Sequence, residues 1–152
     1  MPRERRNALE AALAALNRRA RSVSEMRAWL ADRDFAEPDV EEAIAALADA
    51  GELDDERYAR LFAEDRRALA GWGGDRIAEA LLARGIDRGL AEQVAGEEGH
   101  GEQLERAADL LRRRGPPPAD DRERARALGF LTRRGYPYEI AYEAIRTLER
   151  AA

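Results

Sequence analysis

Apolar residues recur along most of this chain three and four positions apart, the spacing that places side chains on one face of an α-helix. No stretch shows the alternating pattern of a β-strand, so the pattern predicts an all-α fold of about nine helices. The positions expected to face the cores are Leu9, Leu13, Leu16, Met26, Trp29, Leu30, Val40, Ile44, Leu47, Tyr58, Leu61, Phe62, Leu69, Ile77, Leu81, Leu90, Val94, Leu104, Ala108, Leu111, Leu128, Leu131, Ile140, Ala144, Ile145 and Leu148.

One helical phrase occurs three times, at residues 26–35, 77–86 and 127–136. Each copy has a Leu, an Arg three positions later, then Gly or Asp, then a large apolar residue. The turn positions Asp34, Gly85 and Gly135 are 51 and 50 residues apart. This regularity predicts an elongated, curved array of three tandem three-helix repeats, at residues 1–52, 53–97 and 98–152. Because arrays present long surfaces, the pattern favours binding over catalysis.

The first repeat departs from the other two in two ways. Asp34 stands where they have Gly, and Asp tolerates the left-handed conformation better than most residues. The positions of Val40, Leu90 and Ile140 relative to the turns also indicate one extra residue before the third helix of the first repeat.

Several helix ends carry recognisable signals. Ser22 and Glu25 have the spacing of a capping box, and Pro38 fits a first helical turn. Gly51 is a candidate C-terminal cap, and Asp120 or Asp121 a candidate N-cap. The glycines and acids of residues 96–101 are typical of a flexible hinge.

The charge is negative overall but uneven. All 26 basic residues are arginines, and the net charge of −5 argues against a protein that coats bare nucleic acid. Residues 101–152 nevertheless carry a net charge of +2, against −2 for residues 1–50 and −5 for residues 51–100. Any contact with a polyanion is therefore expected at the last repeat and at Arg3, Arg5 and Arg6.

No group of residues indicates catalysis, a metal site or a cofactor. The chain has no cysteine, and its single histidine, His100, lies in the glycine-rich segment. The acidic pairs at residues 54–55, 97–98 and 120–121 are explained by helix capping and solvation. Residues 71–74 lack the ending of a phosphate-binding loop and predict a tight corner with Trp72 packed beneath it. No apolar run is long enough for a membrane span or a signal peptide, so we expect a cytoplasmic protein.

The arginines are the main candidates for function. Arg33, Arg84 and Arg134 occupy the same place in the three phrases, where a cation either caps the helix or meets a partner. The last repeat adds basic clusters at residues 112–114, 122–126 and 133–134. Among the aromatic residues, Trp29 and Phe130 are expected in cores, whereas Tyr136 and Tyr138 are expected to be exposed.

The chain resembles the RecX family of bacterial regulatory proteins. The matching motifs are residues 21–30 in the first repeat, residues 51–62 at the join, residues 73–77 with 84–86 in the second repeat, and residues 131–136 in the third. The resemblance implies three tandem three-helix repeats and a non-enzymatic modulator of RecA, the recombinase that polymerises on single-stranded DNA. Family members bind the RecA filament and suppress its growth, ATP hydrolysis and strand exchange, in recombination, DNA repair and the SOS response.

From the resemblance and the arginine pattern we expect a monomer that contacts the RecA nucleoprotein filament, with weak direct contact to DNA, no membrane and no cofactor. An alternative is a direct nucleic-acid-binding helical repeat protein, which would bind bare DNA with a steep salt dependence. The residues expected to contact the partner are Arg76, Arg84, Arg112, Arg113, Arg114, Arg133, Arg134 and Tyr136.

Overall fold

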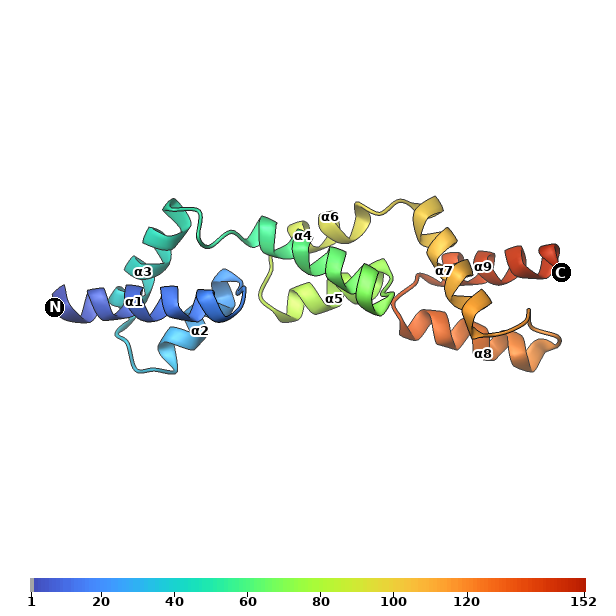
Figure 1. The fold of residues 1–152 in the computed structure, drawn as a ribbon, viewed down its shortest axis with the longest axis horizontal. Coiled ribbons are helices and arrows are strands. Elements are labelled where there is room, and N and C mark those ends of the chain that lie inside the picture. Colours follow the sequence, from blue (N-terminus) through green and yellow to red (C-terminus); the bar gives the residue numbers. More distant parts are fainter. Residues whose placement is uncertain (1) are drawn as a thin grey trace. The chain divides into compact units, whose positions relative to one another are not determined.

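The fold is entirely helical in the part of the chain that the structure describes. The structure is a computed structural model that describes the backbone of residues 2–152 and the side chains of residues 7–152. Within these residues it contains nine α-helices, one π-helical turn and no strand. The ribbon in Figure 1 has coils and no arrows, so the expected all-α class is confirmed. The elements are α1 (Pro2–Arg18), α2 (Val23–Ala31), α3 (Glu37–Asp49), α4 (Asp55–Asp65), the π-helical turn η1 (Arg66–Ala70), α5 (Gly74–Ala83), α6 (Arg88–Gly96), α7 (His100–Arg114), α8 (Asp121–Arg133) and α9 (Tyr138–Ala151).

The helices form two compact units. The first unit comprises Met1–Leu61 and Leu81–Asp87, and the second comprises Phe62–Ala80 and Arg88–Ala152. Helices α4 and α5 therefore each contribute residues to both units. The division of the chain at residues 52 and 97, and the elongation and curvature of the array, stay predictions.

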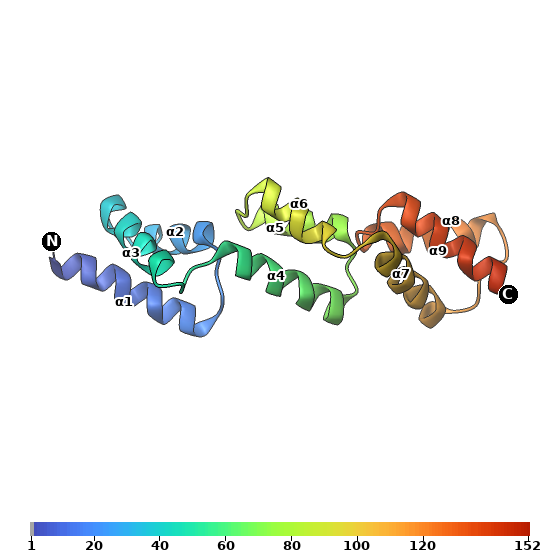
Figure 2. The ribbon, with the colours of Figure 1, turned by 90° about the horizontal axis from the view of Figure 1, so that it is seen from above.

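The first unit is built around α1, α2 and α3, which pack against one another in both views (Figures 1 and 2). Met26, Leu30 and Leu47 are buried in its core, as expected. The inner face of α1 differs from the expectation, because Ala8, Ala12 and Ala15 are fully buried while Leu13 is 38% exposed. Leu9 and Leu16 pack at the sides of this core. The small alanine side chains bring the helix backbones close together, so the larger leucines lie beside the contact.

The second unit has its main core between α7, α8 and α9, which lie at the C-terminal end of the ribbon in Figure 2. Leu111, Leu131, Ile140 and Ile145 are buried there, as the periodicity predicts. The strong amphipathic pattern of α9 also places Ala144 and Leu148 inside.

The sequence prediction for the inner face of α4 and η1 is wrong at two leucines. Leu61 is 52% exposed and Leu69 is 85% exposed, whereas Ala59 and Ala63 are fully buried. Leu61 is two residues from each alanine, which is about 200° around an α-helix, and so it faces the other side. The π-helical turn that contains Leu69 further shifts the helical phase. As on α1, alanines mark the buried face.

The helix ends follow the sequence signals. Ser22 and Glu25 form the complete capping box, and the side chain of Asp120 accepts a hydrogen bond from the Glu123 amide. Gly51 has the left-handed φ of 76° just beyond α3, and Pro38 lies in the first turn of that helix. These helices therefore begin and end close to where the local chemistry predicts.

The three repeats have the same register, so the expected extra residue in the first repeat is wrong. Helices α3, α6 and α9 each begin three residues after their turn positions Asp34, Gly85 and Gly135. The position of Val40 is occupied by Ala91 and Ala141 in the other repeats, and all three side chains are buried. The sequence prediction aligned the large residues Val40, Leu90 and Ile140 with one another. The residues that are structurally equivalent to Val40 in the later repeats are alanines, so this alignment introduces an insertion that the structure does not contain. Asp34 adopts the positive φ of 65° that the phrase requires.

Candidate partner-binding surface

In the second unit, the third copy of the phrase docks by its backbone on the start of α5. The amide of Gly73 donates to the carbonyl oxygen of Arg134 at 2.8 Å, and the amide of Asp75 donates to that of Gly135 at 2.9 Å. Gly73 and Gly135 permit this approach, because a Cβ on either would lie within 2.6 Å of the opposing segment. The contact fixes the position of the turn and hence of the arginines that flank it.

The first unit uses the same kind of contact with different donors. The hydroxyl of Ser22 donates to the carbonyl oxygen of Arg84 at 2.7 Å, and that of Ser24 donates to Gly85 at 3.3 Å. A Cβ on Gly85 would lie 2.2 Å from the Cβ of Ser24. Ser22 therefore both caps α2 and anchors the second copy of the phrase.

Tyr136 is not exposed, contrary to the expectation from sequence. It is 1% exposed, and its hydroxyl donates to the carbonyl oxygen of Gly71 at 3.0 Å. Burial raises the pKa of its hydroxyl above the usual value, so it stays protonated at neutral pH. The side chain supports the corner at residues 71–74 and offers almost no exposed surface. Tyr138, by contrast, is 61% exposed, as expected.

Aromatic rings hold several of the predicted arginines in place. The guanidinium of Arg76 lies 4.2 Å from the ring centroid of Trp72, and those of Arg114 and Arg134 lie 4.8 and 4.6 Å from Phe130. Such contacts stabilise a guanidinium next to a ring face, and they leave the edge of the guanidinium available for hydrogen bonds. Trp29 and Phe130 are partly buried against the cores, as expected.

Five arginines of the second unit lie at these contacts or at a cavity beside them. Arg76 donates to the carbonyl oxygen of Arg133 at 3.4 Å, and Arg134 donates to that of Ala70 at 3.1 Å. Arg113 and Arg134 line the same cavity of about 320 Å³ next to η1. We call this set the arginine surface, and its members are Arg76, Arg113, Arg114, Arg133 and Arg134.

The other predicted site residues do not join this surface. Arg84 belongs to the first unit, where its carbonyl accepts the bond from Ser22. Arg112 is paired with Asp109 at 2.7 Å, which offsets its charge. The side chains of Arg3, Arg5 and Arg6, expected to help in a polyanion contact, lie outside the described residues.

Sequence reasoning missed a carboxylate that organises the cavity wall. Glu98, expected in a flexible and solvated hinge, has a side chain only 9% exposed. It lies 2.8 Å from Nε of Arg106 and 3.9 Å from Nε of Arg67. Arg106 also donates to the carbonyl oxygens of Arg67 and Trp72. These three side chains, far apart in sequence, tie residues 96–100 to η1. No local motif indicates them.

Potential metal-ligating side chains do not cluster among the residues that the structure describes. No group of three or more His, Asp or Glu side chains there is placed to hold a metal ion. His100 does have an acidic neighbour, since its Nε2 lies 2.7 Å from a carboxylate oxygen of Glu143, but both side chains are largely exposed. In the same part of the chain, the search for a helix with the length and apolar character of a membrane span finds none.

Comparisons with known proteins agree with the repeat pattern. The family models for the first, second and third three-helix domains of RecX match residues 8–47, 54–94 and 101–145. A regulatory protein RecX of Trichlorobacter lovleyi is 36% identical, with 86% of this chain and 88% of that protein covered. One of Thermus thermophilus is 38% identical, with 91% and 90% covered.

A solved structure has the same fold. The crystal structure of RecX from Lactobacillus salivarius superposes with a TM-score of 0.89 at 22% identity, with 99% of each chain covered. The three domain matches in chain order, together with relatives that are 36% and 38% identical over most of their length, show that this chain belongs to the RecX family of regulatory proteins.

Proposed function

We propose that this protein is a non-enzymatic, cytoplasmic regulator that binds the RecA filament on single-stranded DNA and inhibits its growth, ATP hydrolysis and strand exchange. Membership of a family of regulatory proteins supports this proposal. The arginine surface is the observation that connects the proposal to particular residues, because this surface contains five of the expected contact residues.

The arginine surface suits a protein partner with acidic groups. The guanidinia of Arg76, Arg114 and Arg134 are held against Trp72 and Phe130, so these three lose little freedom when a carboxylate binds. Arg113 and Arg133 are exposed and form no ion pair within residues 7–152. Positively charged residues that face a partner's carboxylates give specificity and fast association.

Leu69 adds an apolar contact to the same site. It lies at the cavity shared by Arg113 and Arg134 and is 85% exposed on the π-helical turn. An exposed leucine beside arginines matches the mixture of apolar and charged residues found at protein interfaces. The proposed contact therefore combines Leu69 with the arginine surface.

RecA-dependent ATP hydrolysis on single-stranded DNA tests the proposal. The hydrolysis rate is measured while this protein is added, and its affinity for the same DNA is measured without RecA. We expect inhibition at protein concentrations well below those at which it binds the bare DNA. An unchanged rate at every ratio to RecA would overturn the proposal.

A further inference from the structure

The outer face of α9 carries a row of aromatic and basic side chains that the proposed function does not use. Tyr138, Tyr142, Arg146 and Arg150 are spaced four residues apart, which places each about 6 Å further along one side of the helix. All four are exposed. We call them the α9 stripe.

The two tyrosines form an open stacking platform. Their ring planes are inclined by only 12°, with centroids 6.2 Å apart. Tyr138 is 61% exposed and Tyr142 is 39% exposed. The guanidinium of Arg146 lies 5.7 Å from the Tyr142 ring and donates to its hydroxyl at 3.3 Å. The pair therefore presents ring surface to the outside and a cation beside it.

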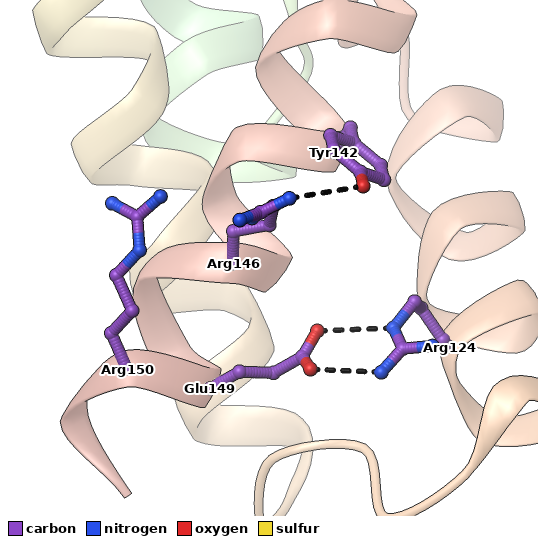
Figure 3. Close-up of a pocket in the computed structure, with 5 residues that line it drawn as sticks. All are labelled: Arg124, Tyr142, Arg146, Glu149 and Arg150. Atoms are coloured by element: carbon purple, nitrogen blue, oxygen red, sulfur yellow. Dashed lines mark hydrogen bonds and ion pairs between the residues drawn. The ribbon is translucent and has the colours of Figure 1, made fainter.

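The basic half of the stripe lines a cavity, shown in Figure 3. The cavity has a volume of about 360 Å³ and is lined by Tyr142, Arg146 and Arg150, together with Arg124 of α8 and Glu149 of α9. Arg124 donates two hydrogen bonds to Glu149, at 3.1 and 2.9 Å. This bonding lowers the pKa of Glu149, which keeps the pair fully charged and mutually neutralised.

Arg146 and Arg150 therefore supply the uncompensated charge of the cavity. Neither forms an ion pair with a residue in the described part of the chain. Two further acids lie nearby: Glu143 lies 2.7 Å from His100, and Asp121 lies 2.6 Å from Arg124, whose single charge it shares with Glu149. The charge at the cavity mouth favours an anionic ligand, and the adjoining rings favour a flat one.

We propose that the α9 stripe binds single-stranded nucleic acid, with unpaired bases stacked on Tyr138 and Tyr142 and the backbone phosphates held by Arg146 and Arg150. Exposed aromatic rings next to cations are the combination that proteins binding single strands without sequence preference use. An acidic peptide would use the arginines but gain nothing from two parallel rings. A duplex keeps its bases stacked inside and cannot reach the tyrosines.

The inference also fits the negative net charge of the chain. A total of −5 opposes general attraction to a polyanion, so binding depends on the local charge of the stripe. We therefore expect modest affinity that falls with salt. This site does not rest on the proposed function, since no RecA takes part in it.

The test is fluorescence anisotropy of a labelled oligothymidylate and of a duplex of the same length, over a range of salt concentrations. The wild-type protein is expected to bind the single strand more tightly than the duplex. The variant Tyr138→Ala/Tyr142→Ala is expected to bind it about tenfold or more weakly, because stacking is lost. Its salt dependence should be unchanged.

The variant Arg146→Gln/Arg150→Gln separates the phosphate contacts from the stacking. Losing two contacts should reduce the slope of log K against log salt by about 1.4. The matched control, Arg57→Gln/Arg88→Gln, removes the same charge from exposed arginines elsewhere and should leave the slope almost unchanged. Circular dichroism checks that each variant keeps its helices.

Crosslinking shows where the strand lies. A bromodeoxyuridine-containing strand should crosslink on irradiation to the peptide that contains Tyr138 and Tyr142. An oligouridylate with the same tyrosine dependence would support the stripe as a site for RNA as well. The inference would be overturned if the tyrosine variant bound the strand as tightly as the wild type, or if the protein preferred the duplex. It would also be overturned if crosslinks formed only elsewhere, or if polyglutamate displaced the strand as effectively as unlabelled strand does.

Discussion

The hydroxyl of Tyr136 donates a hydrogen bond to the carbonyl oxygen of Gly71 at 3.0 Å, across 65 positions of the sequence. It joins the third copy of the phrase to the corner between η1 and α5. Together with the bond from Gly73 to Arg134, it fixes the turn on which the arginine surface depends. Tyr136 thus supports the proposed binding surface from inside.

Tyr136→Phe should lower the free energy of unfolding by about 1 kcal/mol, because the Gly71 carbonyl loses its partner while the ring stays in place. Tyr136→Ala should cost about 3 kcal/mol or more, because it also leaves a cavity. Urea denaturation measures both. Tyr138→Phe is the control, since its exposed hydroxyl should contribute almost nothing. Equal stabilities of the Tyr136 and Tyr138 variants would contradict the assigned role.

Alkaline pH should weaken the same contact. The pKa of Tyr136 is raised in the folded protein, so the folded state binds a proton that the unfolded state has already lost. The stability that this group contributes is present below the unfolded pKa of about 10 and is lost as pH rises through the folded value. Denaturation midpoints measured across that range should therefore fall less in Tyr136→Phe than in the wild type. Parallel curves would rule this out.

Gly135→Ala should be much more damaging than Gly51→Ala. Both glycines have positive φ, which costs an alanine about 1 kcal/mol or more. Only at Gly135 would the new Cβ lie 2.2 Å from the Cβ of Arg76, whereas none is within 4 Å at Gly51. We expect a loss of about 3 kcal/mol at Gly135 by thermal or urea denaturation. Similar losses at both positions would show that the close backbone contact is absent.

Ser22→Ala should destabilise the first unit by about 2 kcal/mol. The substitution removes the cap of α2 and also the bond to the carbonyl of Arg84. Asp120→Ala removes a cap alone and should cost about 1 kcal/mol. Denaturation of the two variants under the same conditions compares them, and a larger effect at Asp120 would argue against the double role of Ser22.

Glu98→Gln should lower the free energy of unfolding by about 2 kcal/mol, because Arg67 and Arg106 would lose the negative charge that lies between them. Glu105→Gln, at an exposed position of α7, should change it by less than about 0.5 kcal/mol. Hydrogen exchange of residues 96–103 would report the loosened segment. Unchanged exchange in Glu98→Gln would contradict the contact.

The sequence predicts the helices and their caps well, because periodicity, Ser22, Asp120 and the glycine turns act locally. The sequence prediction fails where the buried residue is small and its large apolar neighbour is exposed. Ala12 and Ala63 are buried while Leu13 and Leu69 are exposed, since close helix packing selects small side chains. Ala91 and Ala141 obscure the common register of the repeats for the same reason.

The candidate site was predicted in part. The local basic clusters identify Arg113, Arg114, Arg133 and Arg134 without the fold. The burial of Tyr136 and of Glu98 depends on contacts made across many residues, which no local pattern carries. The exposed pair Tyr138 and Tyr142 appears only once α9 presents them on one side.

The central claim is that the arginine surface inhibits RecA, and charge reversal at its exposed members tests it most directly. Arg113→Glu/Arg133→Glu spares Arg134, whose side chain anchors Ala70. In RecA-dependent ATP hydrolysis on single-stranded DNA, half-inhibition should require about tenfold more of this variant than of wild type. The matched reversal Arg57→Glu/Arg88→Glu should inhibit like wild type. Undiminished inhibition by a correctly folded Arg113→Glu/Arg133→Glu protein would contradict the account.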